Sequence, residues 1–163
     1  MNENLENEEK NLALVPEEDE NVRSLSDFRN SKQRTDIGTY TNITDRKELF
    51  NLSSKVDFKL NDCENEKIKV KKVLIRTFTK LLRKPIVDEE TGEILKETET
   101  SMSVVLVDEN GNSYATGSKT FGYQLINYLV DFDGSKDLEN GVTIQIVKNP
   151  TPSGNKALGF ILV

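Results

Sequence analysis

Apolar and polar residues alternate along much of the chain after residue 55, the pattern of β-strands that bury one face. The alternation predicts a short strand at 55–60 and five further strands at 67–84, 99–107, 113–117, 142–147 and 156–163. Between the third and fourth of these five, apolar residues recur at helical spacing from about residue 120 to 132. A shorter helix is predicted after Asp45, with Asp45 as N-cap and Glu48 as its capping-box partner.

The alternation in the first long strand slips by one residue. Ile68 and Val70 share one face, but the next apolar pair is Val73 and Ile75. An extra residue near Lys71 is a β-bulge, which bends the strand and lets it belong to both sheets of a small barrel. With one helix after the third strand, the order is that of the OB-fold. We therefore expect a mainly β, OB-like five-stranded Greek-key barrel; a β-sandwich or half-open barrel with an inserted helix is the alternative.

Turn residues mark the connections between these elements. Thr91 and Gly92 predict a protruding hairpin after Pro85, and Asn110-Gly111 predicts a tight hairpin turn. The helix is expected to end near Gly134, a suitable C-cap residue.

The chain divides into three parts by composition. Residues 1–25 are rich in Asn and Glu and are expected to be a disordered acidic tail. Residues 26–60 are expected to form an N-terminal arm with the short helix and strand, and residues 61–163 the OB-like domain. The first 20 residues sum to −7, so the remaining 143 sum to +1 although the whole chain carries −6.

Composition argues against most catalytic chemistry. Histidine is absent and Cys63 is the single cysteine, so the commonest general base, zinc ligand and activated nucleophiles are missing. We expect a protein that is not an enzyme and needs no cofactor or metal. Neither a membrane-spanning run nor a signal peptide is evident, which favours a cytoplasmic protein.

The segment "ATGSKTF" at 115–121 has some features of a phosphate-binding loop. In a P-loop the lysine directly follows the last glycine, between a parallel strand and its helix. Here Ser118 separates Gly117 from Lys119, and the preceding strand belongs to an antiparallel meander. We interpret the segment as a strand-to-helix connection capped by Ser118 or Thr120, with Lys119 placed to contact a phosphate of a nucleic-acid backbone.

A basic stretch carries the strongest functional indication. Residues 67–84 contain eight cations and no acid. Strand parity puts Arg76, Phe78 and Lys80 on one face, a ring between two cations, which suits single-stranded nucleic acid. Tyr114 is a candidate second stacking platform. The alternative is that Phe78 belongs to the core and the lysines are a solvated strand edge.

Four segments resemble a known family: "SDFRNSK" at 26–32, "VDEETGEIL" at 87–95, "SYATGSKTF" at 113–121 and "SGNKALGF" at 153–160. They are similar to the single-stranded DNA-binding proteins of small tailed phages of Gram-positive bacteria that replicate with a protein-primed polymerase. The resemblance implies coating and protection of displaced strands during phage DNA replication, in the host cytoplasm, without a cofactor. The acidic run lies at the N-terminal end, where we expect it to compete with DNA or contact a replication protein.

The leading hypothesis is therefore a single-stranded DNA-binding protein with little sequence preference. The rival hypothesis is a protein-interaction or host-takeover adaptor that acts through the acidic tail and the 85–98 hairpin, and a weaker one is a regulator that binds duplex DNA. The candidate DNA-binding residues are Lys69, Lys71, Lys72, Arg76, Phe78, Lys80, Arg83, Lys84, Tyr114, Lys119, Lys148 and Lys156.

Overall fold

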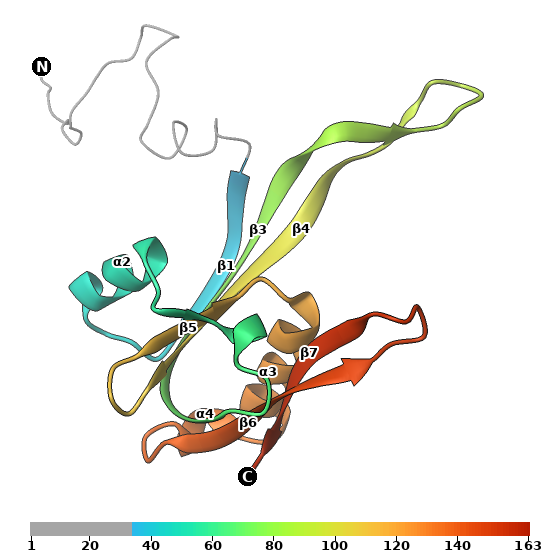
Figure 1. The fold of residues 1–163 in the computed structure, drawn as a ribbon. Coiled ribbons are helices and arrows are strands. Elements are labelled where there is room, and N and C mark those ends of the chain that lie inside the picture. The colour runs from blue at the N-terminus through green and yellow to red at the C-terminus, as the bar shows by residue number, and fades with distance from the viewer. Residues whose placement is uncertain (1–33) are drawn as a thin grey trace, which may run out of the picture. The chain divides into compact units, whose positions relative to one another are not determined.

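The computed structural model describes residues 34–163, and Asp36–Val163 form one compact unit (Figure 1). The expected acidic tail, residues 1–25, lies outside the described residues. Within the described part, no helix is both long and apolar enough to span a membrane.

The described chain is mainly β, as the alternation predicts. Its strands are β1 (Arg34–Thr41), β2 (Phe58–Lys59), β3 (Lys67–Val87), β4 (Ile94–Asp108), β5 (Ser113–Thr116), β6 (Val142–Pro150) and β7 (Lys156–Leu162). Its helical segments are α2 (Arg46–Ser54), the single 3-10 turn η2 (Leu60–Asp62), α3 (Lys119–Asp131) and α4 (Gly134–Asp137).

All seven strands belong to one mixed sheet with the order β2-β5-β4-β3-β6-β7, and β1 pairs with β3 in addition. β3 is the central strand of the sheet, because it pairs with three other strands: β4, β6 and β1. Its first residues, Lys67–Val70, pair with β6. Beyond the core, β3 and β4 continue together as a long two-stranded hairpin (Figure 1).

The predicted bulge in β3 is confirmed. The register with β4 shifts between Val70 and Lys72, so both Val70 and Val73 point into the core. The parity of the two apolar pairs along β3 was therefore sufficient to locate the bend.

The core lies between the inner face of the sheet and α3. Phe121, Leu125 and Leu129 recur along one face of α3 and are buried against the sheet. At Gly122 a Cβ would overlap the Met102 sulfur of β4, so the absence of a side chain there allows the close approach. Phe132, the last residue of the predicted helical pattern, is not part of this buried face and is 68% exposed.

Two turn predictions have different outcomes. Gly111 lies in the β4–β5 turn with a φ of 87°, a conformation that favours glycine, as predicted. Gly134 is not the C-cap of α3: Phe132 is, Asp133 adopts the left-handed conformation and Gly134 begins α4. A side chain at Gly134 would overlap the ring of Tyr128, which explains the glycine there.

The expected closed barrel is not confirmed, because the sheet is open. Closure would need β5 to pair with β7. The outer edge of β5 is instead occupied by the parallel strand β2. On β7, the Gln124 side chain of α3 donates to the carbonyl of Phe160 at 2.7 Å and accepts its N–H at 3.1 Å. Backbone groups at the edges of β5 and β7 thus have hydrogen-bond partners although the two strands do not pair with each other.

Gln124→Ala should lower the free energy of unfolding by about 1 to 2 kcal/mol, because it removes both hydrogen bonds to the β7 edge. Urea denaturation followed by circular dichroism measures the change. Asn127→Ala is the matched control, since Asn127 is an exposed residue of the same helix. Equal effects of the two substitutions would contradict the proposed role of Gln124.

Candidate nucleic-acid interface

The outer face of β3, opposite the core, carries the predicted basic and aromatic residues. Arg76 and Phe78 are half-buried and Lys80 is exposed, whereas Ile75 on the inner face is buried. Their partners on β4 are small or acidic: Ser103 opposite Arg76, Ser101 opposite Phe78 and Glu99 opposite Lys80. The ring between two cations that parity predicted is therefore present on one strand face.

Part of this outer face is covered by a segment that we name the strap, residues 42–57, which contains α2. A cavity between the two is lined by residues 52–56 on one side and by Leu74, Arg76, Ser103 and Val105 on the other. Leu74 and Val105 are buried although they face away from the main core. The strap thus covers the sheet next to the bulge and leaves the face around Lys80 exposed.

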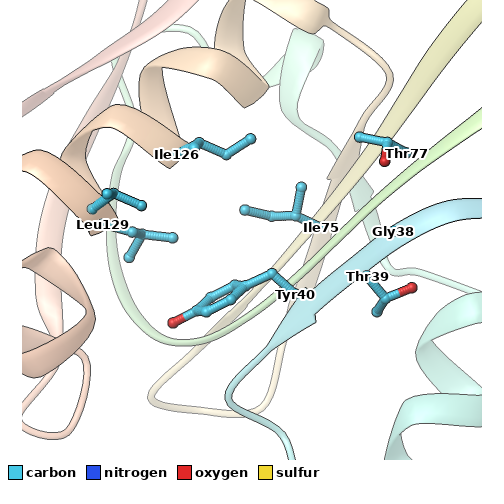
Figure 2. Close-up of a pocket in the computed structure, with 8 residues that line it drawn as sticks. Gly38, Thr39, Tyr40, Ile75, Thr77, Ile126 and Leu129 are labelled. Carbon is cyan, nitrogen blue, oxygen red and sulfur yellow. The ribbon is translucent and has the colours of Figure 1, made fainter.

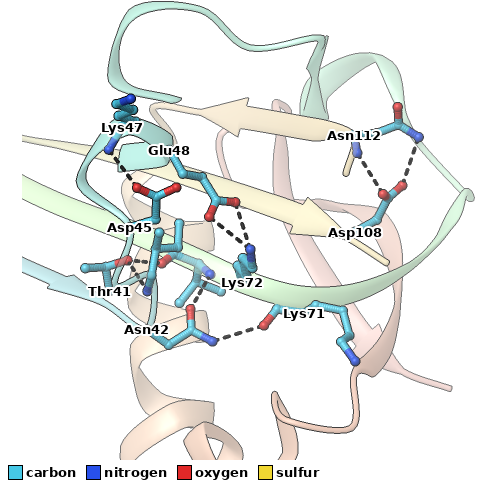
Figure 3. A network of polar contacts seen from close by, with 11 residues as sticks. Thr41, Asn42, Asp45, Lys47, Glu48, Lys71, Lys72, Asp108 and Asn112 are labelled. Atoms are coloured by element: carbon cyan, nitrogen blue, oxygen red, sulfur yellow. Dashed lines mark hydrogen bonds and ion pairs between the residues drawn. The ribbon is translucent and has the colours of Figure 1, made fainter. Parts of the chain in front are cut away.

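Polar contacts fix the N-terminal end of the strap at the bulge (Figure 3). The Asn42 amide donates to the Lys71 carbonyl at 3.0 Å and accepts the Val73 N–H at 2.9 Å. Asp45 caps α2 as predicted, accepting the Lys47 N–H at 3.1 Å.

The other end of the strap is fixed to β5. The Asp57 N–H donates to Ser113, and the Asp57 carboxylate accepts both the N–H and the hydroxyl of Ser113. Between its two ends, α2 has no buried residue. Among the described residues, its one polar contact with the sheet is made by the carboxylate of Glu48, which binds the Lys72 ammonium at 2.9 Å in place of completing a capping box.

Three of the predicted phosphate-contacting cations have protein partners. Lys72 pairs with Glu48, and Lys69 lies 3.8 Å from the carboxylate of Glu109. Lys71 donates to a backbone carbonyl in the turn before β6. The basic stretch has no acid in the sequence, but acids from other segments come close to it in the fold. These pairs are largely solvated and each is worth about 1 kcal/mol or less, so a phosphate can compete for them.

The remaining cations follow β3 into what we name the distal hairpin, residues 80–98. Lys80, Arg83 and Lys84 are exposed there. The turn at the tip of the hairpin is acidic. Asp88 stabilises this turn, because its carboxylate accepts the N–H groups of residues 90 and 91. Those two hydrogen bonds hold the pKa of Asp88 below its ordinary value. Three of the hairpin's four cations therefore lie at its base, and four of its five acids lie at its tip.

The structure does not place Tyr114 where it could stack on a base. Only 9% of its surface is exposed, its ring stacks on Phe58 with centroids 5.3 Å apart, and its hydroxyl donates to Asp108. Burial, reinforced by that hydrogen bond, raises the pKa of Tyr114 to about 12. Burial also acts to raise the pKa of Asp108, but its bonds from residues 112, 114 and 110 lower it overall. Phe58, 49% exposed, is the accessible ring of this pair.

The last three candidate lysines lie on other elements. Lys119 is exposed at the start of α3, where Ser118 accepts the Phe121 N–H at 3.2 Å and so caps the helix as predicted. Lys148 is half-buried on β6 and Lys156 is exposed at the start of β7. Both belong to the β6–β7 hairpin, which in the view of Figure 1 projects toward the same side as the β3–β4 hairpin.

An apolar hollow of about 290 Å³ lies on the inner face between β1, β3 and α3. Tyr40, Ile75, Ile126 and Leu129 are among the side chains around it (Figure 2). None of its lining residues is charged, so it offers no site for a phosphate.

Several residues of this region were missed by the sequence analysis. Asn42 was not singled out, and Glu48 was expected only as a capping-box partner, because their contacts with β3 depend on pairings between distant segments. Phe58 gave a signal, its place in the alternation of residues 55–60, but that pattern does not show whether its ring faces solvent.

Comparisons with known proteins leave the function open. No family model, no curated protein and no solved structure matches the chain.

The tyrosine pKa values predict an alkaline loss of stability. Tyr128 also has its pKa raised to about 12, by burial first and then by its hydrogen bond to Asp137. Because the folded pKa exceeds the ordinary value of 10, each phenol stabilises the fold fully below pH 10, and this contribution is lost as pH rises toward 12.

Tyr114→Phe and Tyr128→Phe should therefore each remove one phenol that ionises near pH 12 and flatten the decline in stability above pH 10. Ultraviolet titration of phenolate and urea denaturation at several pH values measure the two effects. An unchanged titration near pH 12 in either variant would show that the assignment is wrong.

Proposed function

We propose that this protein binds single-stranded DNA with little sequence preference and coats displaced strands during phage DNA replication. The observation that carries the proposal is the outer face of β3, where Arg76, Phe78 and Lys80 follow one another along one strand face. Cations along such a face neutralise backbone phosphates, and a ring stacks on any base.

The fold supports the proposal through the position of this face. We propose that the sheet is an open form of the OB-fold, since β5-β4-β3-β6-β7 is the OB strand order and α3 follows the third of those strands. OB-folds commonly bind single strands on this sheet face and with the hairpins that correspond to β3–β4 and β6–β7. Lys148 and Lys156 lie on the second hairpin.

We propose fewer residues as direct phosphate contacts than the sequence suggested. Arg76, Lys80, Arg83 and Lys84 form the centre of this set, because none of them forms an ion pair within residues 34–163. Lys69, Lys71 and Lys72 contribute only by exchanging a protein partner for a phosphate. Lys119 remains a peripheral candidate on α3.

The first test combines Lys80→Gln, Arg83→Gln and Lys84→Gln in one variant. Fluorescence polarisation with labelled oligo-dT should show weaker binding, and the slope of log K against log salt should fall by about 2, as about 0.7 is lost per phosphate contact. The wild type should bind oligo-dT more tightly than a duplex of equal length.

Lys59→Gln and Lys136→Gln together provide the matched control, because both lysines are exposed and lie outside β3 and the strap. This control should bind oligo-dT like the wild type. If the wild type fails to bind oligo-dT at low salt, or if control and test variants weaken equally, the proposal is wrong.

The second test addresses stacking. Phe78→Leu keeps apolar bulk on the half-buried position but removes the ring. We expect a loss of about 1 to 3 kcal/mol in oligo-dT binding with an unchanged salt slope, because stacking involves no counterion release. Thermal unfolding checks that the variant is folded; intact affinity in a folded variant would exclude Phe78 from the interface.

A second candidate function, a protein-interaction adaptor, is favoured by one observation. Ile86, Val87, Ile94 and Leu95 on the distal hairpin are 45% to 62% exposed. Exposed apolar side chains gathered on one protruding element are typical of a protein-binding surface. Ile94→Ser with Leu95→Ser distinguishes the candidates: the adaptor hypothesis predicts loss of partner binding with oligo-dT affinity unchanged.

A further inference from the structure

One of the residues that line the cavity under the strap carries an unsatisfied donor. Arg76 Nε is buried, and no acceptor lies within hydrogen-bond distance of it among residues 34–163. A buried N–H without a partner costs about 1 to 3 kcal/mol, so native proteins normally supply a protein acceptor, a water or an ion. Ser103, the residue opposite Arg76, does not accept a hydrogen bond from this Nε.

The lining of this cavity is suited to an anion. It is about 190 Å³ in volume, and its polar lining residues are Lys55, Arg76 and Ser103, together with Ser53 and Ser54 from the end of α2. The other lining residues are apolar: Leu52, Val56, Leu74, Val105 and Ala115. None of the described residues that line it is acidic, in a chain with 28 carboxylate residues. A water occupies about 30 Å³ of liquid, so the space exceeds what one water fills.

The available donors come from three separate elements. Arg76 is on β3, Ser103 on β4, and Lys55 follows α2. The hydroxyls of Ser53 and Ser54 donate to the carbonyl of residue 50 and are therefore not free donors. A tetrahedral oxyanion accepts hydrogen bonds from several directions, and an arginine favours phosphate over a spherical anion by its planar geometry.

We propose that the cavity between the strap and β3–β4 is a phosphate-binding site, formed by Arg76, Lys55 and Ser103, that holds one backbone phosphate of bound single-stranded DNA. This assignment to a DNA phosphate rests on the proposed function; the anion site itself does not. It adds Lys55 and Ser103 to the interface, and it places the strap at the DNA-binding surface instead of merely covering the sheet.

The test follows the Arg76 Nε–H signal of the full chain in a proton–nitrogen correlation spectrum. The signal is assigned by its loss in Arg76→Lys, and the probe is inorganic phosphate. We expect a saturable shift with phosphate and none with sodium chloride at equal ionic strength. A shift that does not saturate, or that chloride reproduces, would overturn the site.

Variants identify the other donors. Lys55→Gln and Ser103→Ala should each weaken phosphate binding by about tenfold, the effect of losing one hydrogen bond to a charged group. Lys59→Gln, on the neighbouring strand β2, removes an exposed lysine that does not line the cavity and should leave the affinity unchanged. Equal affinity in all three variants would remove Lys55 and Ser103 from the site.

Competition distinguishes DNA phosphate from free phosphate. Oligo-dT should displace inorganic phosphate from the Arg76 signal, whereas a methylphosphonate oligo-dT, whose backbone is uncharged, should not. If oligo-dT binds the protein by polarisation without displacing phosphate, the cavity takes free phosphate and the assignment to the strand is wrong. If oligo-dT does not bind at all, the proposed function fails, while the phosphate titration still decides the anion site.

Discussion

The bulge in β3 is the constraint on which the rest of the fold depends. A bulge leaves backbone groups of one strand without ladder partners. Here the Asn42 amide bonds the Lys71 carbonyl and the Val73 N–H, and the Thr41 hydroxyl bonds the Val73 carbonyl at 2.7 Å. Side chains thus replace a neighbouring strand where β3 changes partner. The same contacts fix the start of the strap, so the bend in the sheet and the cover of its outer face have one common origin.

Much of the fold follows from periodicity, but closure of the sheet does not. The alternation located the long strands, the parity slip located the bulge, and the helical spacing of Phe121, Leu125 and Leu129 located α3. Whether a sheet closes depends on which groups reach its edges. Gln124 is an ordinary polar residue on a helix until β7 comes beside it, and β2 is too short for its parallel pairing with β5 to be anticipated. Which group bonds a strand edge depends on what lies next to that edge in the folded protein, and the order of strands along the sequence does not give this.

The sequence predicted which residues of the candidate site share a strand face, but not which acids lie beside its cations. Arg76, Phe78 and Lys80 lie on one face because strand periodicity is strict. The acids beside the basic stretch come from residues 48, 99 and 109, each far from its partner in sequence. Tyr114 shows a second limit, since alternation assigns a face but not what covers it. Its ring is covered by Phe58 of β2, and its hydroxyl is bonded by Asp108 at the end of β4.

The charge distribution of the distal hairpin decides how far electrostatics alone can drive binding. The positive charges at its base and the negative charges at its tip nearly cancel when summed over the hairpin. A bound DNA strand, however, responds to the local electrostatic potential. At about 3.3 Å per residue, Lys80 lies roughly 30 Å along the strand from the acids at the tip, several times the Debye length of about 8 Å at physiological salt. The tip acids are therefore screened from Lys80 at physiological salt. In dilute salt, where the screening length approaches that distance, they repel a strand that extends past Arg83 and Lys84, so binding would be confined to the face between the strap and Lys80.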